Sequence, residues 1–340
     1  MNWKCSIILL AAGILVSCAG SPRPADHPAT TATARVWPAP PDAPRIVFRQ
    51  CLHGPADIGV RPAIFHSLAG WLTGETGESL RLRKPFAVAL DEAGNLCITD
   101  TEANLLCYCD FTRKRWQRFA GAGAFKFASP VAVARRHGIF YVADSRLDRV
   151  LALTDAGKLV FALGAPLQRP VALAIVGERL YVVDALVHAV LVFGLDGKYQ
   201  FRFGGRGTGP GEFNYPTAIG EGPGGQLLVS DTLNSRVQVF DRDGHFVSTF
   251  GSNGDTSGHF ARPKGVAADA AGHIYVVDAV YDNFQIFDPA GRLLLNVGES
   301  GNQPGSFALP SGIAIGADNR IFVADSFNHR VQVFQYTGEP

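Results

Sequence analysis

Short apolar runs separated by turn residues recur through most of the chain, from about residue 84 to residue 336. In each copy a proline precedes a short apolar strand, a turn with glycine follows, a second strand ends in aspartate, and a third strand comes next. These runs are short and alternate in period two, which predicts β-strands rather than helices. The chain is therefore expected to consist mainly of short antiparallel strands.

Two independent markers show that the copies keep a regular spacing. Successive marker prolines lie 45, 40, 46, 47 and 47 residues apart, and successive aspartates lie 44, 40, 47, 47 and 47 apart. The prolines are Pro85, Pro130, Pro170, Pro216, Pro263 and Pro310. The aspartates are Asp100, Asp144, Asp184, Asp231, Asp278 and Asp325. Short strands in a repeat of this length indicate four-stranded antiparallel blades, so six copies predict an all-β, six-bladed β-propeller.

The clearest copies run from Val229 to Phe240 and from Val323 to Phe334. They resemble the NHL repeat, and the second contains its Asn-His-Arg triplet intact at residues 328–330. The resemblance covers about residues 84 to 336 and implies a propeller fold, but it says little about chemistry, because NHL propellers serve many functions. The copies around Asp100 and Asp278 depart from the pattern.

The last copy ends at Phe334-Gln335-Tyr336, one strand short of its neighbours. The apolar segment from Ile46 to Gly54 has the pattern of the missing strand. We therefore expect residues 45–54 to complete the last blade and close the ring, so that no sheet edge stays open there. This places the propeller domain at residues 45–340.

The connection over residues 55–84 is longer than the others and carries apolar residues at helical spacing. Those residues are Ile64, Phe65, Leu68, Trp71 and Leu72. Pro62 suits the first turn of a helix and Gly74 suits its end, so one short helical insertion is predicted. It either caps the channel mouth or packs on the flanks of the blades.

The N-terminus has the features of an export signal. Lys4 precedes an apolar run from Ile7 to Val16, which is too short to span a bilayer. Residues 1–17 resemble a bacterial lipoprotein signal peptide, which implies a lipidated Cys18; ordinary secretion is the alternative. Ala19 follows that cysteine, which by resemblance favours the outer membrane of a Gram-negative bacterium. Residues 18–44 are rich in Ala, Pro and Thr and are expected to form a tether.

Charge and cysteine content narrow the possible partners. The formal net charge is +1, so a nucleic-acid groove, which needs a dense cationic surface, is not expected. Export would allow disulfides, and Cys97 could bridge to Cys107 or Cys109; buried free thiols are the other possibility. With Cys51 these cysteines lack paired histidine spacing and make a weak zinc signal.

Antiparallel blades place their connections alternately on two faces. Short Gly turns lie on one face, and the aspartate turns and blade-to-blade loops lie on the other, which we call the loop-rich face. The channel mouth on that face should be lined by the residue that follows each marker proline. Those residues are Phe86, Val131, Val171, Thr217, Lys264 and Ser311. Lys264 is the single charge among them, so the mouth suits a ligand that carries a carboxylate.

Further residues on the loop-rich face vary between copies and are candidates for contact with a ligand. They are Glu102, Arg146, Tyr281, Asp282 and Phe327. The six repeated aspartates, in contrast, are expected to accept backbone N–H groups and order the turns, with Arg149, Arg236 and Arg330 as partners. His188 and His329 occupy equivalent positions on opposite sides of the ring and are interpreted as ordinary loop histidines.

The sequence contains no convincing catalytic set. The leading hypothesis is an envelope lipoprotein whose propeller binds a protein, peptide or glycan, with a membrane contact through the lipid anchor only. No cofactor is predicted for it. The alternative is a metal-dependent propeller enzyme of the lyase or lactonase type, with Ca²⁺ or Zn²⁺ at the channel mouth.

Overall fold

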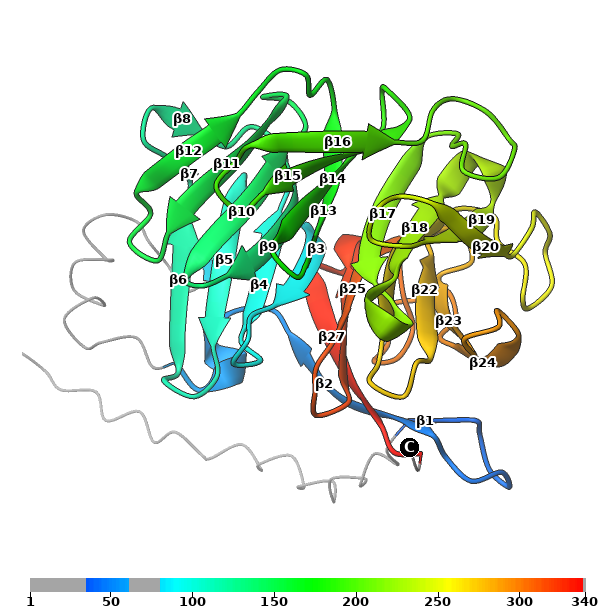
Figure 1. Cartoon of the computed structure of the whole chain (residues 1–340). Helices are drawn as coiled ribbons and strands as arrows, with labels where there is room; N and C mark the ends of the chain where they lie inside the picture. The colour runs from blue at the N-terminus through cyan, green and yellow to red at the C-terminus, as the bar shows by residue number, and fades with distance from the viewer. Residues whose placement is uncertain (1–34, 61–79, 339–340) are drawn as a thin grey trace, which may run out of the picture. The chain divides into compact units, whose positions relative to one another are not determined.

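The computed structural model describes residues 35–60 and 80–338, and all of them lie in one compact unit. Within this unit six antiparallel sheets surround a central channel (Figure 1). The first strands of the six sheets contact one another in a closed ring, in the order β3, β9, β13, β17, β21, β25 and back to β3. The fold is therefore the six-bladed propeller that the repeat predicts.

The first three blades each use four consecutive strands. Blade 1 contains β3 (Pro85–Leu90), β4 (Leu96–Asp100), β5 (Leu105–Asp110) and β6 (Arg115–Phe119). Blade 2 contains β9 (Pro130–Arg136), β10 (Ile139–Asp144), β11 (Arg149–Thr154) and β12 (Leu159–Leu163). Blade 3 contains β13 (Pro170–Val176), β14 (Arg179–Asp184), β15 (Ala189–Gly194) and β16 (Tyr199–Phe203). A small hairpin, β7 (Gly121–Ala122) and β8 (Phe125–Lys126), precedes blade 2.

Blades 4 and 5 repeat the same arrangement, and blade 6 departs from it. Blade 4 contains β17 (Pro216–Glu221), β18 (Leu227–Asp231), β19 (Arg236–Phe240) and β20 (Phe246–Phe250). Blade 5 contains β21 (Pro263–Ala268), β22 (Ile274–Asp278), β23 (Asn283–Phe287) and β24 (Leu293–Val297). Blade 6 contains β25 (Pro310–Ile315), β26 (Arg320–Asp325), β27 (Arg330–Tyr336), β2 (Ile46–Leu52) and β1 (Val36–Trp37). Every first strand begins at a marker proline, and every second strand ends at a marker aspartate.

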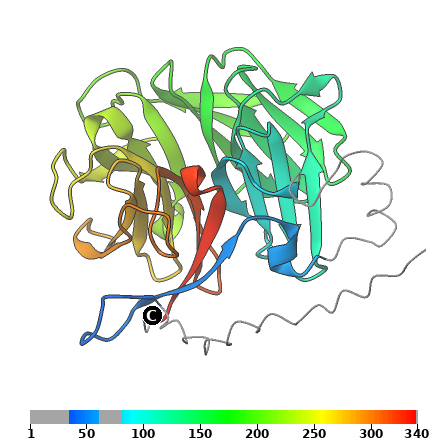
Figure 2. The same cartoon turned by 180° about the vertical axis from the view of Figure 1, so that it is seen from behind.

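Blade 6 joins the two ends of the described chain. Strand β2 pairs antiparallel with β27, from Ile46 opposite Tyr336 to Leu52 opposite Val331. Both Ile46 and Leu52 are fully buried, because each belongs to an apolar cluster between blade 6 and a neighbouring blade. The red and blue strands lie side by side in both views (Figures 1 and 2). The ring is closed here by pairing of strands, as the pattern around Ile46 predicts.

The structured part of the chain begins earlier than the sequence suggests. The boundary predicted between tether and propeller lies at residue 44, yet Val36 and Trp37 already pair with β2 as strand β1. The Trp37 ring packs against Phe334, with ring centroids 5.7 Å apart. This apolar contact and the added strand explain why residues 35–44 belong to the propeller. Residues 1–34, with the signal peptide and Cys18, and most of the predicted helical insertion lie outside the described residues.

The four cysteines are free thiols. Cys97 on β4 stands opposite Tyr108, whereas Cys107 on β5 stands opposite Ile98, so Cys97 points to the other face of the sheet from Cys107 and Cys109. Burial raises the pKa of the Cys107 and Cys109 thiols to about 12. Of the two alternatives, buried free thiols are what the structure contains.

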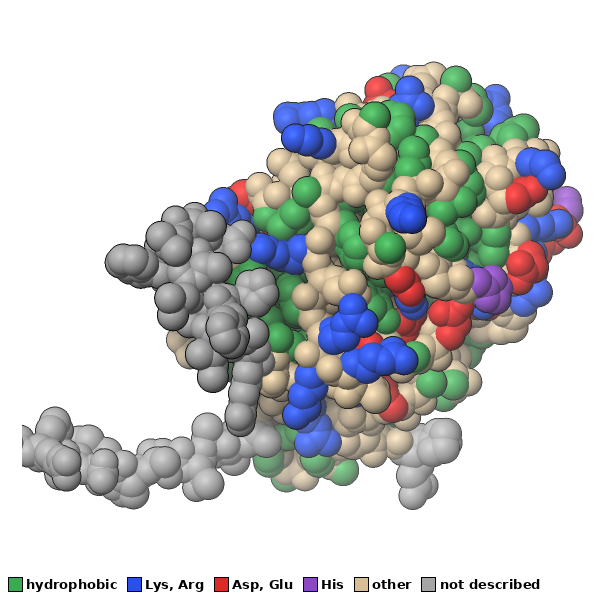
Figure 3. All heavy atoms as spheres, turned by 90° about the vertical axis from the view of Figure 1, so that its left-hand side faces the viewer, with side chains coloured by type: hydrophobic (Ala, Val, Ile, Leu, Met, Phe, Trp, Pro, Cys, Tyr) green, Lys and Arg blue, Asp and Glu red, His purple; other side chains and the backbone are tan. Residues whose placement is uncertain are grey.

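The remaining described elements are short. They are the 3-10 turns η1 (Pro55–Ile58), η3 (Pro223–Gly225), η4 (Thr232–Asn234) and η5 (Ser326–Asn328). Within residues 35–60 and 80–338, no helix has the length and apolar character needed to cross a membrane. On the side of the propeller seen in Figure 3, Lys and Arg side chains are spread widely and Asp and Glu side chains lie mostly toward the right of the view.

Candidate binding site at the channel mouth

A cavity of about 220 Å³ lies at the channel, where the six innermost strands begin. All six residues that follow the marker prolines line it: Phe86, Val131, Val171, Thr217, Lys264 and Ser311. They converge because each proline opens the first strand of a blade, and the first strands form the wall of the ring. Position in the repeat therefore predicts position in the cavity.

Glycines allow the innermost strands to approach one another closely. A Cβ at Gly265 would lie 2.5 Å from the carbonyl oxygen of Ser311, and a Cβ at Gly312 would lie 2.8 Å from that of Phe86. Real side chains do not reach such distances, so only glycine fits at these two positions. The close approach keeps the channel narrow between blades 5, 6 and 1.

Lys264 is the charged residue that the sequence places in the cavity. Its side chain is only partly exposed, and burial lowers the pKa of the Lys264 ammonium, with the positive charge of Arg262 acting in the same direction. A desolvated ammonium of this kind gains much from a nearby anion, because the effective dielectric constant is low there. No acidic side chain lines the cavity among the residues that the structure describes.

The structure adds residues to this site that reasoning from the sequence missed. Arg169, Tyr215 and Ser145 also line the cavity, so Lys264 is not its only cation. The Arg169 guanidinium lies over the Tyr215 ring, 5.8 Å from the ring centroid, which holds it beside the mouth. Arg169 and Tyr215 each stand directly before a marker proline. The position before the proline is the signal that could have identified them.

Two of the predicted ligand contacts already have partners within the ring. The Ser311 hydroxyl donates to the carbonyl oxygen of Phe86 at 2.5 Å, and so ties blade 6 to blade 1. The Thr217 hydroxyl is hydrogen-bonded to Thr232 at 2.5 Å. Because their hydrogen bonds hold neighbouring segments together, these residues shape the wall of the cavity, and Lys264 and Arg169 supply its charge.

The other three candidate contacts do not line the cavity. The Tyr281 hydroxyl donates to the carbonyl oxygen of Gly254 at 2.6 Å, and the Asp282 carboxylate accepts the backbone N–H of Leu309 at 2.7 Å. Arg146 has an exposed side chain on the turn after Asp144. These side chains hold loops or face solvent, because their turns lie farther from the channel axis than the first strands.

The repeated aspartates organise turns. Asp100, for example, accepts the backbone N–H groups of Arg83, Lys84, Glu102 and Ala103 at 2.6–3.2 Å. In blades 4 and 6 an arginine joins the aspartate: Arg236 to Asp231 at 2.8 Å and Arg330 to Asp325 at 2.7 Å. Arg149 does not pair with Asp144 as expected. Its guanidinium lies over the Phe125 ring instead, 5.3 Å from the centroid.

The two equivalent histidines are also engaged in loop contacts. Nδ1 of His188 accepts the backbone N–H of Tyr215 at 3.0 Å, and Nδ1 of His329 contacts the carbonyl oxygen of Arg83. In the described part of the chain, no group of three or more His, Cys, Asp or Glu side chains is arranged to hold a metal ion.

Comparison with known proteins identifies the repeat. The NHL repeat model matches residues 260–287 and 307–334, which cover much of blades 5 and 6. A family described as a 6-bladed beta-propeller matches residues 164–220. The chain thus contains NHL repeats within a six-bladed propeller. A search of curated protein sequences finds no match to this chain.

Solved structures resemble the chain in fold. Virginiamycin B lyase from Staphylococcus aureus is 13% identical, with 75% of this chain and 95% of that chain covered and a TM-score of 0.55. Hydrazine synthase from Kuenenia stuttgartiensis is 14% identical, with coverage of 74% and 95% and a TM-score of 0.55. A protein of unknown function from Bacteroides thetaiotaomicron is 16% identical, with coverage of 76% and 70% and a TM-score of 0.57. At these identities the likeness concerns the fold alone.

Proposed function

We propose that this protein is a lipid-anchored lipoprotein of the cell envelope whose propeller acts as a binding module for a partner that carries a carboxylate. One observation supports the binding proposal above all. The cavity at the channel mouth has two cations, Lys264 and Arg169, and no acidic side chain among its described lining residues. A peptide, protein or acidic glycan could supply the carboxylate, and its apolar parts would lie against Val131 and Val171.

The electrostatics of the cavity support an anionic ligand. A carboxylate in the mouth would face the partly buried ammonium of Lys264 and the guanidinium of Arg169, which can bind both carboxylate oxygens. It would also relieve the repulsion between Lys264 and Arg262. These charge-assisted contacts are stronger than neutral hydrogen bonds, because the ligand enters a site that is already partly desolvated.

The anchor is proposed from the sequence alone. Lys4, the apolar run and Cys18 have the order of a lipoprotein signal, and the residues that follow are suited to a tether. Metabolic labelling with a radioactive fatty acid tests this: wild-type protein should be labelled, and Cys18→Ser should not. Equal labelling of both, or of neither, would contradict lipidation at Cys18.

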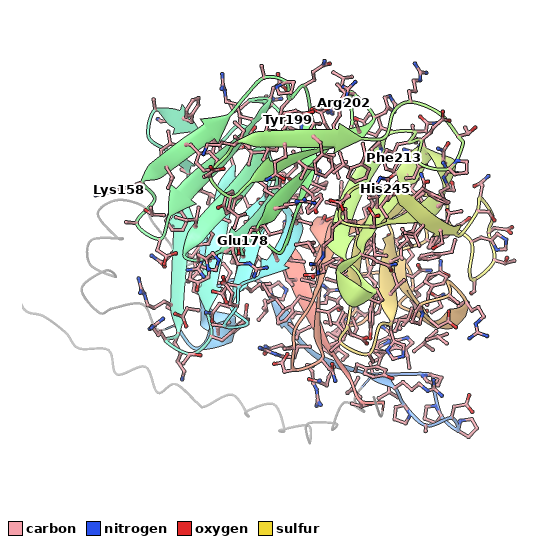
Figure 4. The ribbon with its side chains drawn as sticks, in the orientation of Figure 1. Lys158, Glu178, Tyr199, Arg202, Phe213 and His245 are labelled. Carbon is pink, nitrogen blue, oxygen red and sulfur yellow. The ribbon has the colours of Figure 1, made fainter. Side chains whose placement is uncertain are left out.

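Binding can be tested with succinate as the probe, titrated calorimetrically at low salt, with succinamide as the uncharged control. Wild-type protein should bind succinate and not succinamide, and Lys264→Met should weaken succinate binding by roughly tenfold or more. Lys158→Met is the matched control, because Lys158 lies at the outer edge of the propeller (Figure 4) and should leave affinity unchanged. Equal affinity of Lys264→Met and wild type would remove Lys264 from the site.

The pH dependence of succinate binding gives an independent check. Because burial lowers the pKa of Lys264, its ammonium deprotonates at a lower pH than an ordinary lysine. Affinity should therefore decline as the pH rises toward the usual lysine range, and this decline should be absent from Lys264→Met. Stoichiometric Zn or Ca in the purified protein, together with turnover of a lactone, would instead favour the metal-dependent enzyme.

A further inference from the structure

An arc of exposed apolar side chains lies on the loop-rich face around the cavity. Each blade has one residue two positions after its marker aspartate, and in blades 3 to 6 that residue is apolar. The exposed fractions are 53% for Leu186, 47% for Leu233, 50% for Val280 and 52% for Phe327. We call these four residues the apolar arc. The equivalent residues of blades 1 and 2 are Glu102 and Arg146.

The fold does not require apolar residues at these positions. In blade 3 the backbone N–H of Leu186 donates to Asp184 at 3.1 Å, and in blade 2 that of Arg146 donates to Asp144 at 3.1 Å. In blade 1 the N–H of Glu102 makes the same bond to Asp100 at 3.2 Å. The turn is thus built by the backbone whatever the side chain. Apolar side chains left half exposed in four consecutive blades are typical of an interaction surface.

The arc is continuous with the cavity. In blade 2 the residue before the arc position, Ser145, lines the cavity, so each arc residue follows directly after the wall of the mouth. Blades 3 and 6 are three apart in a ring of six, which places Leu186 and Phe327 on opposite sides of the cavity. An extended ligand that contacts both must cross the mouth. The ammonium of Lys84 lies 4.5 Å from the centroid of the Phe327 ring and adds positive charge at that end.

Resting on the proposed function, we infer that the partner is an extended peptide segment that carries a carboxylate flanked by apolar side chains. The carboxylate enters the cavity toward Lys264 and Arg169, and the apolar side chains lie on the arc. A peptide fits this surface better than a bilayer does, because the apolar residues surround a hollow that a peptide side chain can fill. Each half-exposed arc residue that the peptide covers adds hydrophobic stabilisation.

The test uses a fluorescent nine-residue peptide with blocked ends and one central aspartate flanked by leucine and phenylalanine. One matched peptide has asparagine at its centre, and another has serines in place of the apolar residues. The variant that removes the arc is Leu233→Ser, Val280→Ser and Phe327→Ser. The matched control replaces equally exposed residues on outer strands: Val160→Ser, Val247→Ser and Leu294→Ser, which are 50%, 48% and 43% exposed.

We expect the arc variant to bind the aspartate peptide roughly tenfold or more weakly than wild type and the control variant do, while its affinity for succinate stays the same. Both matched peptides should bind weakly to wild type. Unchanged peptide affinity in the arc variant would overturn the inference but leave the carboxylate site standing. Loss of neither peptide nor succinate binding in Lys264→Met would overturn the proposed function itself. Binding of anionic phospholipid vesicles without peptide binding would also overturn the inference, in favour of a membrane.

Discussion

Blades 2 and 6 have the same strand pattern but hold their aspartate turns in different ways. In blade 2 the Asp144 carboxylate is bound only by backbone N–H groups, including that of Ala128 at 2.7 Å. In blade 6 the buried Asp325 accepts the N–H of Ala308 and also side-chain donors. These donors are Asn328 at 2.9 Å, Arg330 at 2.7 Å and Gln332 at 2.9 Å.

The reason lies in the loop that enters each blade. Residues 298–309 form a long loop before blade 6, in which Phe307 is fully buried. Arg330 donates to the carbonyl oxygens of Asn302, Gln303 and Ser306 in this loop at 2.9–3.0 Å. The arginine and glutamine of the NHL signature thus fasten the entering loop. Blade 2 has a shorter loop with its own hairpin, β7–β8, and Arg149 has no such loop to hold.

The difference in closure should give the largest effect. Blade 2 is continuous, whereas blade 6 depends on β2. Replacing the two fully buried residues of β2, Ile46→Asp with Leu52→Asp, should cost more than about 5 kcal/mol in the free energy of unfolding, measured in urea. The control, Arg49→Asp with Gln50→Asp, changes exposed residues of the same strand and should have little effect.

If the double variant yields no folded protein, Leu52→Ala gives a graded test. It should lower the free energy of unfolding by about 2–5 kcal/mol, because it leaves a cavity in the cluster shared by blades 6 and 1. Stability equal to wild type in Leu52→Ala would show that β2 does not contribute to the ring.

Removing the equivalent arginines should separate the two blades by an intermediate amount. Arg330→Met leaves Asp325 buried without its cation and should cost about 3–5 kcal/mol. Arg149→Met removes a cation–π contact and should cost less than about 1 kcal/mol. Urea unfolding curves of both variants measure the difference, and equal losses would contradict the distinction between the blades.

The cost of Arg330→Met should also depend on pH. Burial already raises the pKa of the Asp325 carboxyl, against the opposing effects of Ala308, Asn328 and Arg330. Loss of Arg330 should raise that pKa further above its unfolded value, so the folded variant gains stability relative to wild type as the pH falls and Asp325 becomes neutral. A stability deficit that stays constant or grows toward acid pH would argue against a buried unpaired carboxylate.

The smallest effect is expected where the two blades carry different residues on the same turn. Exchanging them, as Arg146→Phe with Phe327→Arg, should change the free energy of unfolding by less than about 0.5 kcal/mol, because the turns are built by backbone bonds. Thermal unfolding measures this. A larger loss would mean that Phe327 stabilises the fold, which would weaken the case for the apolar arc as a binding surface.

The sequence by itself determined the fold and much of the cavity wall. The spacing of prolines and aspartates determined six blades, because each unit needs a fixed length of chain for its strands and turns. The pattern around Ile46 identified the closing strand, since β27 would otherwise leave an open sheet edge. Equivalent positions after each proline, such as Lys264, predicted the channel lining, because a propeller brings repeat equivalents together around one axis.

Only the tertiary structure decided which side chains meet. Arg169 and Tyr215 reach the cavity through the path of the loops before blades 3 and 4, which no periodicity encodes. The sequence pairs Arg149 with Asp144 by analogy with Arg330, yet the loop that such an arginine holds is missing in blade 2. Val36 and Trp37 join blade 6 because Phe334 offers them an apolar surface. Such contacts arise between segments far apart in the chain, where local pattern gives no information.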